Sequence, residues 1–203
     1  MTCTIDSETI AQVISFHGHS CPGLALGIRV SEAALKHFSG LELSDLVAVV
    51  ETDMCGVDAI QFLTGCTFGK GNLIHKDYGK MAFSFFHRPS GKGMRLLLDP
   101  AVRKDRDEEM NRLLGKSYAG EATPQEEGRL SALRSEMQEL FLSSGLEELF
   151  ISEVLDCPPP RPPEVLQSLT CEDCGESTME SRTRRFAGRT LCLPCFEKVE
   201  QKM

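Results

Sequence analysis

Two histidines and a cysteine stand close together near the start of the chain. His17 and His19 are separated by one glycine, and Cys21 follows two positions later. On extended backbone, side chains two positions apart project to the same side, so both imidazoles can reach one cation. Imidazole and thiolate ligands suit zinc, iron and nickel. The pattern therefore predicts a metal site, because packing alone does not easily explain a glycine-flanked histidine pair before a cysteine.

Cys21 and Cys55 are each expected at the start of a helix. Pro22 opens a helix predicted over about 22–38, and Cys55 directly precedes one predicted near 56–64. The exposed N–H groups and the dipole at a helix start favour thiolate over thiol. A thiolate with two imidazoles is the ligand set of a zinc site that keeps one position open for water or substrate.

Four further cysteines form a second cluster near the C-terminus. They are arranged as two CxxC pairs separated by residues 175–191: Cys171, Cys174, Cys192 and Cys195. Four thiolates at this spacing can surround one Zn²⁺ at distances of about 2.3 Å. The pattern resembles a treble-clef zinc finger, and we expect the metal to supply its folding energy without chemistry. An iron–sulfur cluster is the alternative.

A glycine-rich loop over 65–72 contains Cys66 and Lys70. Such a loop is typical of anion binding, with the lysine as the point charge, although the spacing is not that of a P-loop. The remaining histidines have no partners in the sequence and are expected to be structural: His37, His75 and His87.

The elements that must position these residues mix helices and strands. We predict the first helix over 9–16, a buried strand over 46–50, a helical region over 101–145 broken near 117–123, and a last strand over 149–155. Between them, short turn-rich connections join strand-like runs and predict an antiparallel meander: 73–76, 81–87 and 95–98.

A proline-rich stretch over 157–163 marks the expected domain boundary, because proline stiffens and extends the backbone. The sequence thus predicts a core domain over 1–160, followed by a linker and zinc finger over 161–203.

Composition narrows the classes of partner. The chain has 203 residues, of which 41% are hydrophobic, and a formal net charge of −8, so it is a globular protein. We do not expect nucleic acid as a partner, since only the finger is locally basic. No stretch approaches the roughly 20 apolar residues of a membrane span, and the start lacks a secretory signal, which predicts a cytoplasmic protein.

Four motifs in order resemble the FmdE family, which takes its name from formylmethanofuran dehydrogenase. They are FHGHxCPGL over 16–24, ETDxCxVDAIQ over 51–61, TGCTxGKGNL over 64–73 and DYGK over 77–80. The likeness spans about residues 10–155, and the finger is an appendage that some members carry.

This resemblance implies an α+β fold with a thioredoxin-like core, in which helices flank a five-stranded mixed sheet. The expected strands are 46–52, 71–77, 80–88, 94–98 and 149–155. It also implies a zinc site made by His17, His19 and Cys55, with Cys21 as a further candidate, and a homodimer. A larger molybdenum or tungsten enzyme is the partner that the family name suggests. The resemblance does not imply a reaction.

The leading hypothesis is a metal-assisted reaction at the core site. The metal would polarise a bound water or carbonyl, Asp53 or Asp58 would accept a proton, and Lys70 would hold an anionic part of the substrate. Cys55 would act in this chemistry as a ligand, and a one-carbon or formyl-carrying substrate is the one that the family name suggests.

Two alternatives stay open. One is a thiol-redox protein that uses Cys21, Cys55 or Cys66. The other is a non-catalytic accessory or metal-delivery subunit that docks through its finger onto a larger enzyme.

Overall fold

The computed structural model describes residues 2–200, apart from the side chains at positions 105 and 106. The chain divides into two compact units, Met1–Pro162 and Pro163–Met203. Within the described residues, no helix combines the length and apolar character needed to cross a bilayer.

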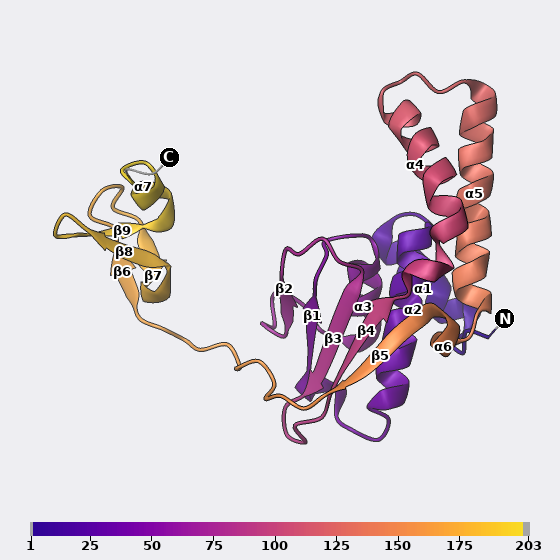
Figure 1. The fold of residues 1–203 in the computed structure, drawn as a ribbon. Coiled ribbons are helices and arrows are strands. Elements are labelled where there is room, and N and C mark those ends of the chain that lie inside the picture. Colours follow the sequence, from indigo (N-terminus) through magenta and orange to yellow (C-terminus); the bar gives the residue numbers. More distant parts are fainter. Residues whose placement is uncertain (1, 201–203) are drawn as a thin grey trace. The chain divides into compact units, whose positions relative to one another are not determined.

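The first unit is built on a mixed five-stranded sheet (Figure 1). Its strands are β1 (Leu46–Val50), β2 (Leu73–His75), β3 (Ala82–His87), β4 (Gly93–Leu98) and β5 (Phe150–Leu155), in the order β2-β1-β3-β4-β5. All five residues of β1 are buried, as expected for the apolar strand with partners on both sides. The predicted α+β class with a mixed five-stranded sheet is confirmed.

The predicted meander through 73–76, 81–87 and 95–98 is wrong in its first strand. β2 pairs in parallel with β1, with His75 opposite Val50, and β3 pairs with the other side of β1. A helix lies between β1 and β2 in the chain, and parallel neighbours need a crossover of this kind. Only β3, β4 and β5 form an antiparallel meander.

Helices follow the predicted pattern in most of the first unit. They are α1 (Ser7–His17), α2 (Pro22–His37), α3 (Gly56–Thr64), α4 (Lys104–Tyr118), α5 (Pro124–Ser143) and the short α6 (Leu146–Leu149). Three 3-10 turns also occur along the chain, at Leu43–Asp45, Pro100–Val102 and Glu180–Arg182. Figure 1 shows α4 and α5 as a hairpin that extends beyond the sheet. Thr123 and Glu126 form a capping box that starts α5.

The main core lies between the sheet and the helices. Ala48 and Val50 of β1 pair with Phe85 and Phe83 of β3, and all four join a buried cluster with residues of α2 and α5. The opposite face of the sheet carries a smaller cluster around Val47, Val49 and Phe86. The helices therefore cover one face of the sheet and bring their ends to its edges.

The second unit contains two small two-stranded sheets and one helix. β6 (Ser168–Thr170) pairs with β7 (Ser177–Met179), β8 (Thr183–Phe186) pairs with β9 (Arg189–Cys192), and α7 (Leu193–Glu197) follows. Apart from its cysteines, Leu191 is the only residue of its small cluster that is fully buried among those described. A core of this size supports the prediction that a metal contributes most of the folding energy.

The backbones of α2 and α3 touch at a pair of glycines. A Cβ on Gly27 would lie 2.2 Å from the carbonyl oxygen of Gly56 and 2.4 Å from its Cα. Because these atoms belong to a buried backbone, the two helices must separate to admit a methyl group.

We expect Gly27→Ala to lower the free energy of unfolding by about 1–3 kcal/mol, the usual cost of overpacking. The matched control is Gly115→Ala in α4, where a Cβ meets nothing within 4 Å. That control should gain up to about 1 kcal/mol from helix propensity. Urea denaturation of both variants measures the difference, and equal stability would contradict this account of the contact.

Candidate metal centre

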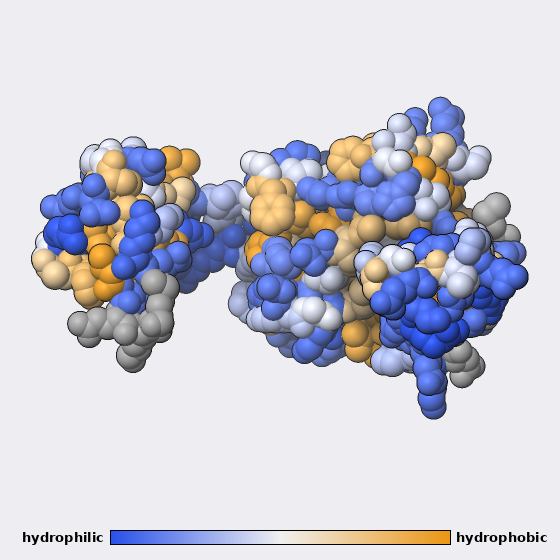
Figure 2. Space-filling model, turned by 90° about the horizontal axis from the view of Figure 1, so that it is seen from above, coloured by the Kyte–Doolittle hydropathy of each residue, from blue (hydrophilic) through white to orange (hydrophobic). Residues whose placement is uncertain are grey.

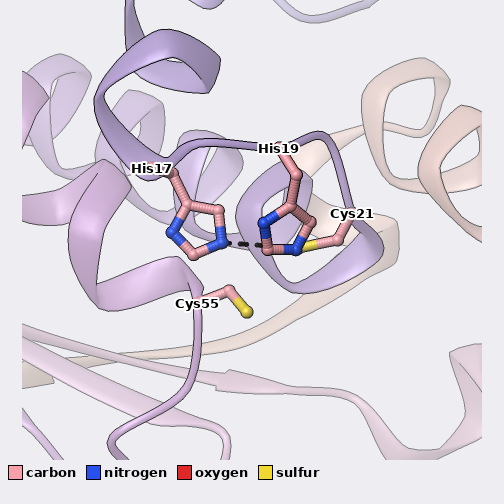
Figure 3. A group of neighbouring side chains, drawn as sticks. All are labelled: His17, His19, Cys21 and Cys55. Carbon is pink, nitrogen blue, oxygen red and sulfur yellow. Dashed lines mark hydrogen bonds between the residues drawn. The ribbon is translucent and has the colours of Figure 1, made fainter.

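Four predicted ligands from three segments meet at one point in the first unit. His17 is the last residue of α1, His19 lies in the following loop, and Cys21 and Cys55 precede α2 and α3. One ligand atom from each lies within 4.8 Å of the others. Figure 3 shows the four side chains pointing toward one another.

A left-handed glycine places the two histidines together. Gly18 ends α1 with φ 95°, a conformation that disfavours other residues, and its N–H group donates to the Ile14 carbonyl. The chain then reverses, so that the rings of His17 and His19 lie with centroids 4.4 Å apart. The sequence HGH therefore works as a helix end as well as a pair of ligands.

Asp58 fixes the orientation of His17. Nδ1 of His17 donates to Oδ2 of Asp58 at 2.7 Å, and Gln61 donates to the other carboxylate oxygen at 3.3 Å. Nε2 of His17 is left to face the group, 4.0 Å from the sulfur of Cys21. A carboxylate behind a histidine in this way sets its tautomer and raises its basicity as a metal ligand.

The two thiols differ in their surroundings. The sulfur of Cys21 accepts the N–H of Leu24 at 3.4 Å, the helix-start contact expected from the sequence. Cys55 makes no such capping contact. Burial raises the pKa of the Cys55 thiol above its ordinary value, and the neighbouring Cys21 raises it further. The expectation that the helix start alone favours a Cys55 thiolate is therefore wrong, and a nearby cation is needed.

The donor set fits a transition metal. Ligand atoms around a tetrahedral zinc lie about 3.3–3.8 Å apart, so atoms already within 4.8 Å need only small side-chain movements. Two imidazoles and two sulfurs suit zinc, and also iron or nickel. Three of the four residues are partly buried, and His19 is exposed. His19 is therefore the ligand that is easiest to displace.

A depression of about 340 Å³ opens beside these residues. His17, Cys55 and Asp58 line it, together with Asp53, Met54, Phe68 and His75. Asp53 is exposed and makes no side-chain hydrogen bond with the described residues. Asp53 is thus the carboxylate that is free to exchange a proton, whereas Asp58 is occupied by His17.

His75, which the sequence predicts to be structural, lines this depression. Its Nε2 is buried and has no hydrogen-bond partner among the described residues. The parallel register places His75 opposite Val50, at the same sheet edge from which the chain leads to Cys55. Carboxyl ends of parallel strands are where sites form in such sheets. A βαβ reading of residues 46–75 would have been the signal.

Lys70 is not brought to this group. Its Nζ donates to the Gly65 carbonyl at 2.9 Å, and it lines a separate depression with Leu43 and Ser44. The glycine-rich loop contacts Leu46 at the beginning of β1, and the His/Cys group follows the end of β1. The predicted role of Lys70 in holding a substrate at the metal is inconsistent with this position.

Cys66 also lies apart from the group. It is fully buried, its thiol donates to the Leu46 carbonyl at 3.5 Å, and burial raises its pKa. These features are those of a packed thiol rather than a reactive one.

The cysteines of the second unit form their own cluster. Cys171, Cys174, Cys192 and Cys195 each offer a sulfur within 4.8 Å of the others. Backbone N–H groups, first that of Cys174 and then that of Cys192, lower the pKa of Cys171 to about 6. The neighbouring Cys192 thiol raises the pKa of Cys195 instead. Four sulfurs in this arrangement fit a closed tetrahedral zinc site.

The fold and the two clusters define an α+β protein with a C-terminal four-cysteine zinc finger. A family model described as "FmdE, Molybdenum formylmethanofuran dehydrogenase operon" matches residues 16–151, and one described as "Prokaryotic dksA/traR C4-type zinc finger" matches residues 167–201. The chain belongs to the FmdE family.

Two similar proteins extend this comparison. A "Probable S-adenosyl-L-methionine-binding protein" of Archaeoglobus fulgidus is 34% identical over 188 residues, which cover 89% of this chain and 50% of that protein. The chain therefore spans half the length of this relative. The crystal structure of an FmdE-like protein of tungsten formylmethanofuran dehydrogenase, from Syntrophus aciditrophicus, has a TM-score of 0.63 at 24% identity. The match covers 95% of this chain and 92% of the other, and shows that the fold is shared.

Removing the Asp58 carboxylate should weaken metal binding at the core without removing a ligand. We expect Asp58→Ala to lower the affinity of this site about 10- to 100-fold, because His17 loses the group that orients it. Asp58→Asn, which keeps an acceptor oxygen, should lose less. Asp53→Ala is the matched control and should leave affinity unchanged. Competition with a chromophoric chelator measures all three, and equal losses in the two alanine variants would contradict the assignment.

Proposed function

We propose that the first unit is a metal-binding domain whose centre is formed by His17, His19, Cys21 and Cys55. The observation that carries this proposal is that four good ligand atoms from three separate segments lie within 4.8 Å of one another. The second unit holds a structural zinc on its four cysteines. Zinc is the metal that both donor sets favour.

Packing does not explain the arrangement of the first site. His19 is exposed, and its side chain makes no hydrogen bond with the described residues, so it does not stabilise the core. Cys55 lies beside Cys21 although each raises the cost of ionising the other. A cation removes this penalty and uses both thiolates. Asp58 then acts as the partner that positions His17.

When bound, the metal supplies a Lewis acid at one edge of the 340 Å³ depression. Asp53 is placed to accept a proton from a water or substrate that enters there. His75 contributes a second titratable group, and Phe68 provides an apolar wall. This lining suits a small carbonyl compound, and the family description favours a one-carbon or formyl-carrying substrate.

The same family description supports an accessory role beside a larger molybdenum or tungsten enzyme, with the finger as a docking module. In this role the core would hold or deliver metal, and the chain would act as a homodimer with its partner. The S-adenosylmethionine binding named for the archaeal relative is not part of the proposal, because the chain corresponds to only half of that protein.

A thiol-redox role is the second candidate, and one observation favours it. The core has no CxxC pair, yet the fold brings the sulfurs of Cys21 and Cys55 within 4.8 Å of each other. Small movements would allow a disulfide once metal is absent.

Metal content tests the main proposal. The wild-type chain should carry two zinc ions, and His19→Ala/Cys55→Ala should carry one because the core loses half its ligands. Cys171→Ala/Cys174→Ala, the matched pair in the finger, should also carry one. Elemental analysis after anaerobic purification gives these values. Two zinc ions in the His19/Cys55 variant would refute a core site.

Oxidation tests the second candidate. In metal-free protein, mild oxidant should join Cys21 to Cys55, and mass spectrometry of the peptides should locate the bond. Added zinc should protect both thiols, and Cys66→Ala should behave as wild type because that thiol is buried elsewhere. Absence of the disulfide in metal-free protein would exclude redox cycling by this pair.

A further inference from the structure

A second cavity lies on the other side of Met54 from the metal group. It has a volume of about 220 Å³ and is enclosed by α2, α4 and α5. Four methionines and two arginines give it its character: Met54, Met81, Met110, Met137, Arg103 and Arg134. In Figure 2, apolar residues gather where the surface of the first unit is hollowed, beside a strongly hydrophilic surface.

This cavity borders the metal group through Gly23 and Met54. Met54 lines both the cavity and the depression, and its sulfur accepts the N–H of Gly56 at 2.9 Å. A Cβ on Gly23 would lie 3.2 Å from the Cβ of Cys55 and 3.8 Å from its sulfur. The absence of a side chain at position 23 therefore leaves only a thin wall between the cavity and a metal ligand.

The lining is apolar and adaptable. Met110 and Met137 are 7% and 3% exposed, and the thioether side chain can adopt several shapes around a guest. Apolar walls with a few polar groups are typical of small-molecule sites. The volume is below the roughly 300–1,000 Å³ of drug-sized sites, so the guest must be small.

The two arginines give the cavity a positive charge. Arg134 forms no ion pair with any described side chain, and it extends from the same helix as Met137. Arg103 pairs with Asp107 at 2.8 Å, but a guanidinium has five N–H donors and retains some. One carboxylate facing two guanidinium groups leaves a net positive charge that a single anion can balance.

We propose that this cavity binds a small monocarboxylate with an apolar body. The carboxylate pairs with Arg134, aided by Arg103, and the apolar body lies against the methionines. Because the cavity adjoins Cys55, the bound molecule presents an end to the metal centre and is its substrate class; only this last statement rests on the proposed function.

Isothermal titration of the full zinc-loaded chain with octanoate tests the proposal. One octanoate per chain should bind, and 1-octanol, which has the same apolar body without the charge, should bind more weakly. Arg134→Gln should weaken octanoate binding about 10- to 100-fold, the usual value of a hydrogen bond to a charged group. Arg112→Gln removes the same charge from the same hairpin outside the cavity and should change little.

Met137→Trp fills the cavity and should abolish binding of both compounds. Equal losses in the Arg134 and Arg112 variants, equal affinity for octanol and octanoate, or no binding by the wild type would each overturn the proposal. The Arg134 comparison does not depend on the core variant's folding, since Arg134 is exposed.

The His19→Ala/Cys55→Ala variant separates this inference from the proposed metal site. Octanoate should still bind to it, because neither substituted residue lines the cavity. Octanoate binding by a wild-type chain that carries no core metal would support the cavity and refute the metal site. Two zinc ions without octanoate binding would do the reverse.

Discussion

The backbones of α2 and α3 are in direct contact, and this is possible only because glycines face each other there. Gly27 lies against Gly56, and Gly23 lies against Met54 and Cys55. Any side chain at these positions would push the helices apart and separate Cys21 from Cys55. The close approach therefore determines the size of the metal group. It also determines that the apolar cavity and the depression share a wall at Met54.

A buried ion pair holds other parts of the first unit to α2. The side chains of Arg29 and Glu32 are each 1% exposed and pair at 2.6 Å. Glu32 also accepts the Thr4 N–H at 3.0 Å, and Arg29 donates to the Ser144 carbonyl at 2.7 Å. The start of the chain and the end of α5 are thus tied to the helix that begins after Cys21. Because loss of one partner leaves a buried charge uncompensated, this connection resists local opening.

The two aspartates near Cys55 show how position divides chemical roles. Asp58 lies in the first turn of α3, where it reaches His17, and its charge is used to orient a ligand. Asp53 precedes the helix and faces solvent at the depression. Identical carboxyl groups thus serve in one case to position a ligand and in the other to exchange protons. The difference arises from their distance to His17 and from nothing in their own chemistry.

The sequence alone determined the features that depend on local spacing. The two CxxC pairs, the HGH turn, the helix starts at Cys21 and Cys55, and the family could be identified from residues close together in the chain. The tertiary structure decided the strand order, which placed His75 at the site, Lys70 at the opposite end of β1, and Cys21 beside Cys55. Local patterns are governed by backbone geometry over a few residues. Strand order depends on which distant segments bury each other, and short apolar strands carry no signal of that choice.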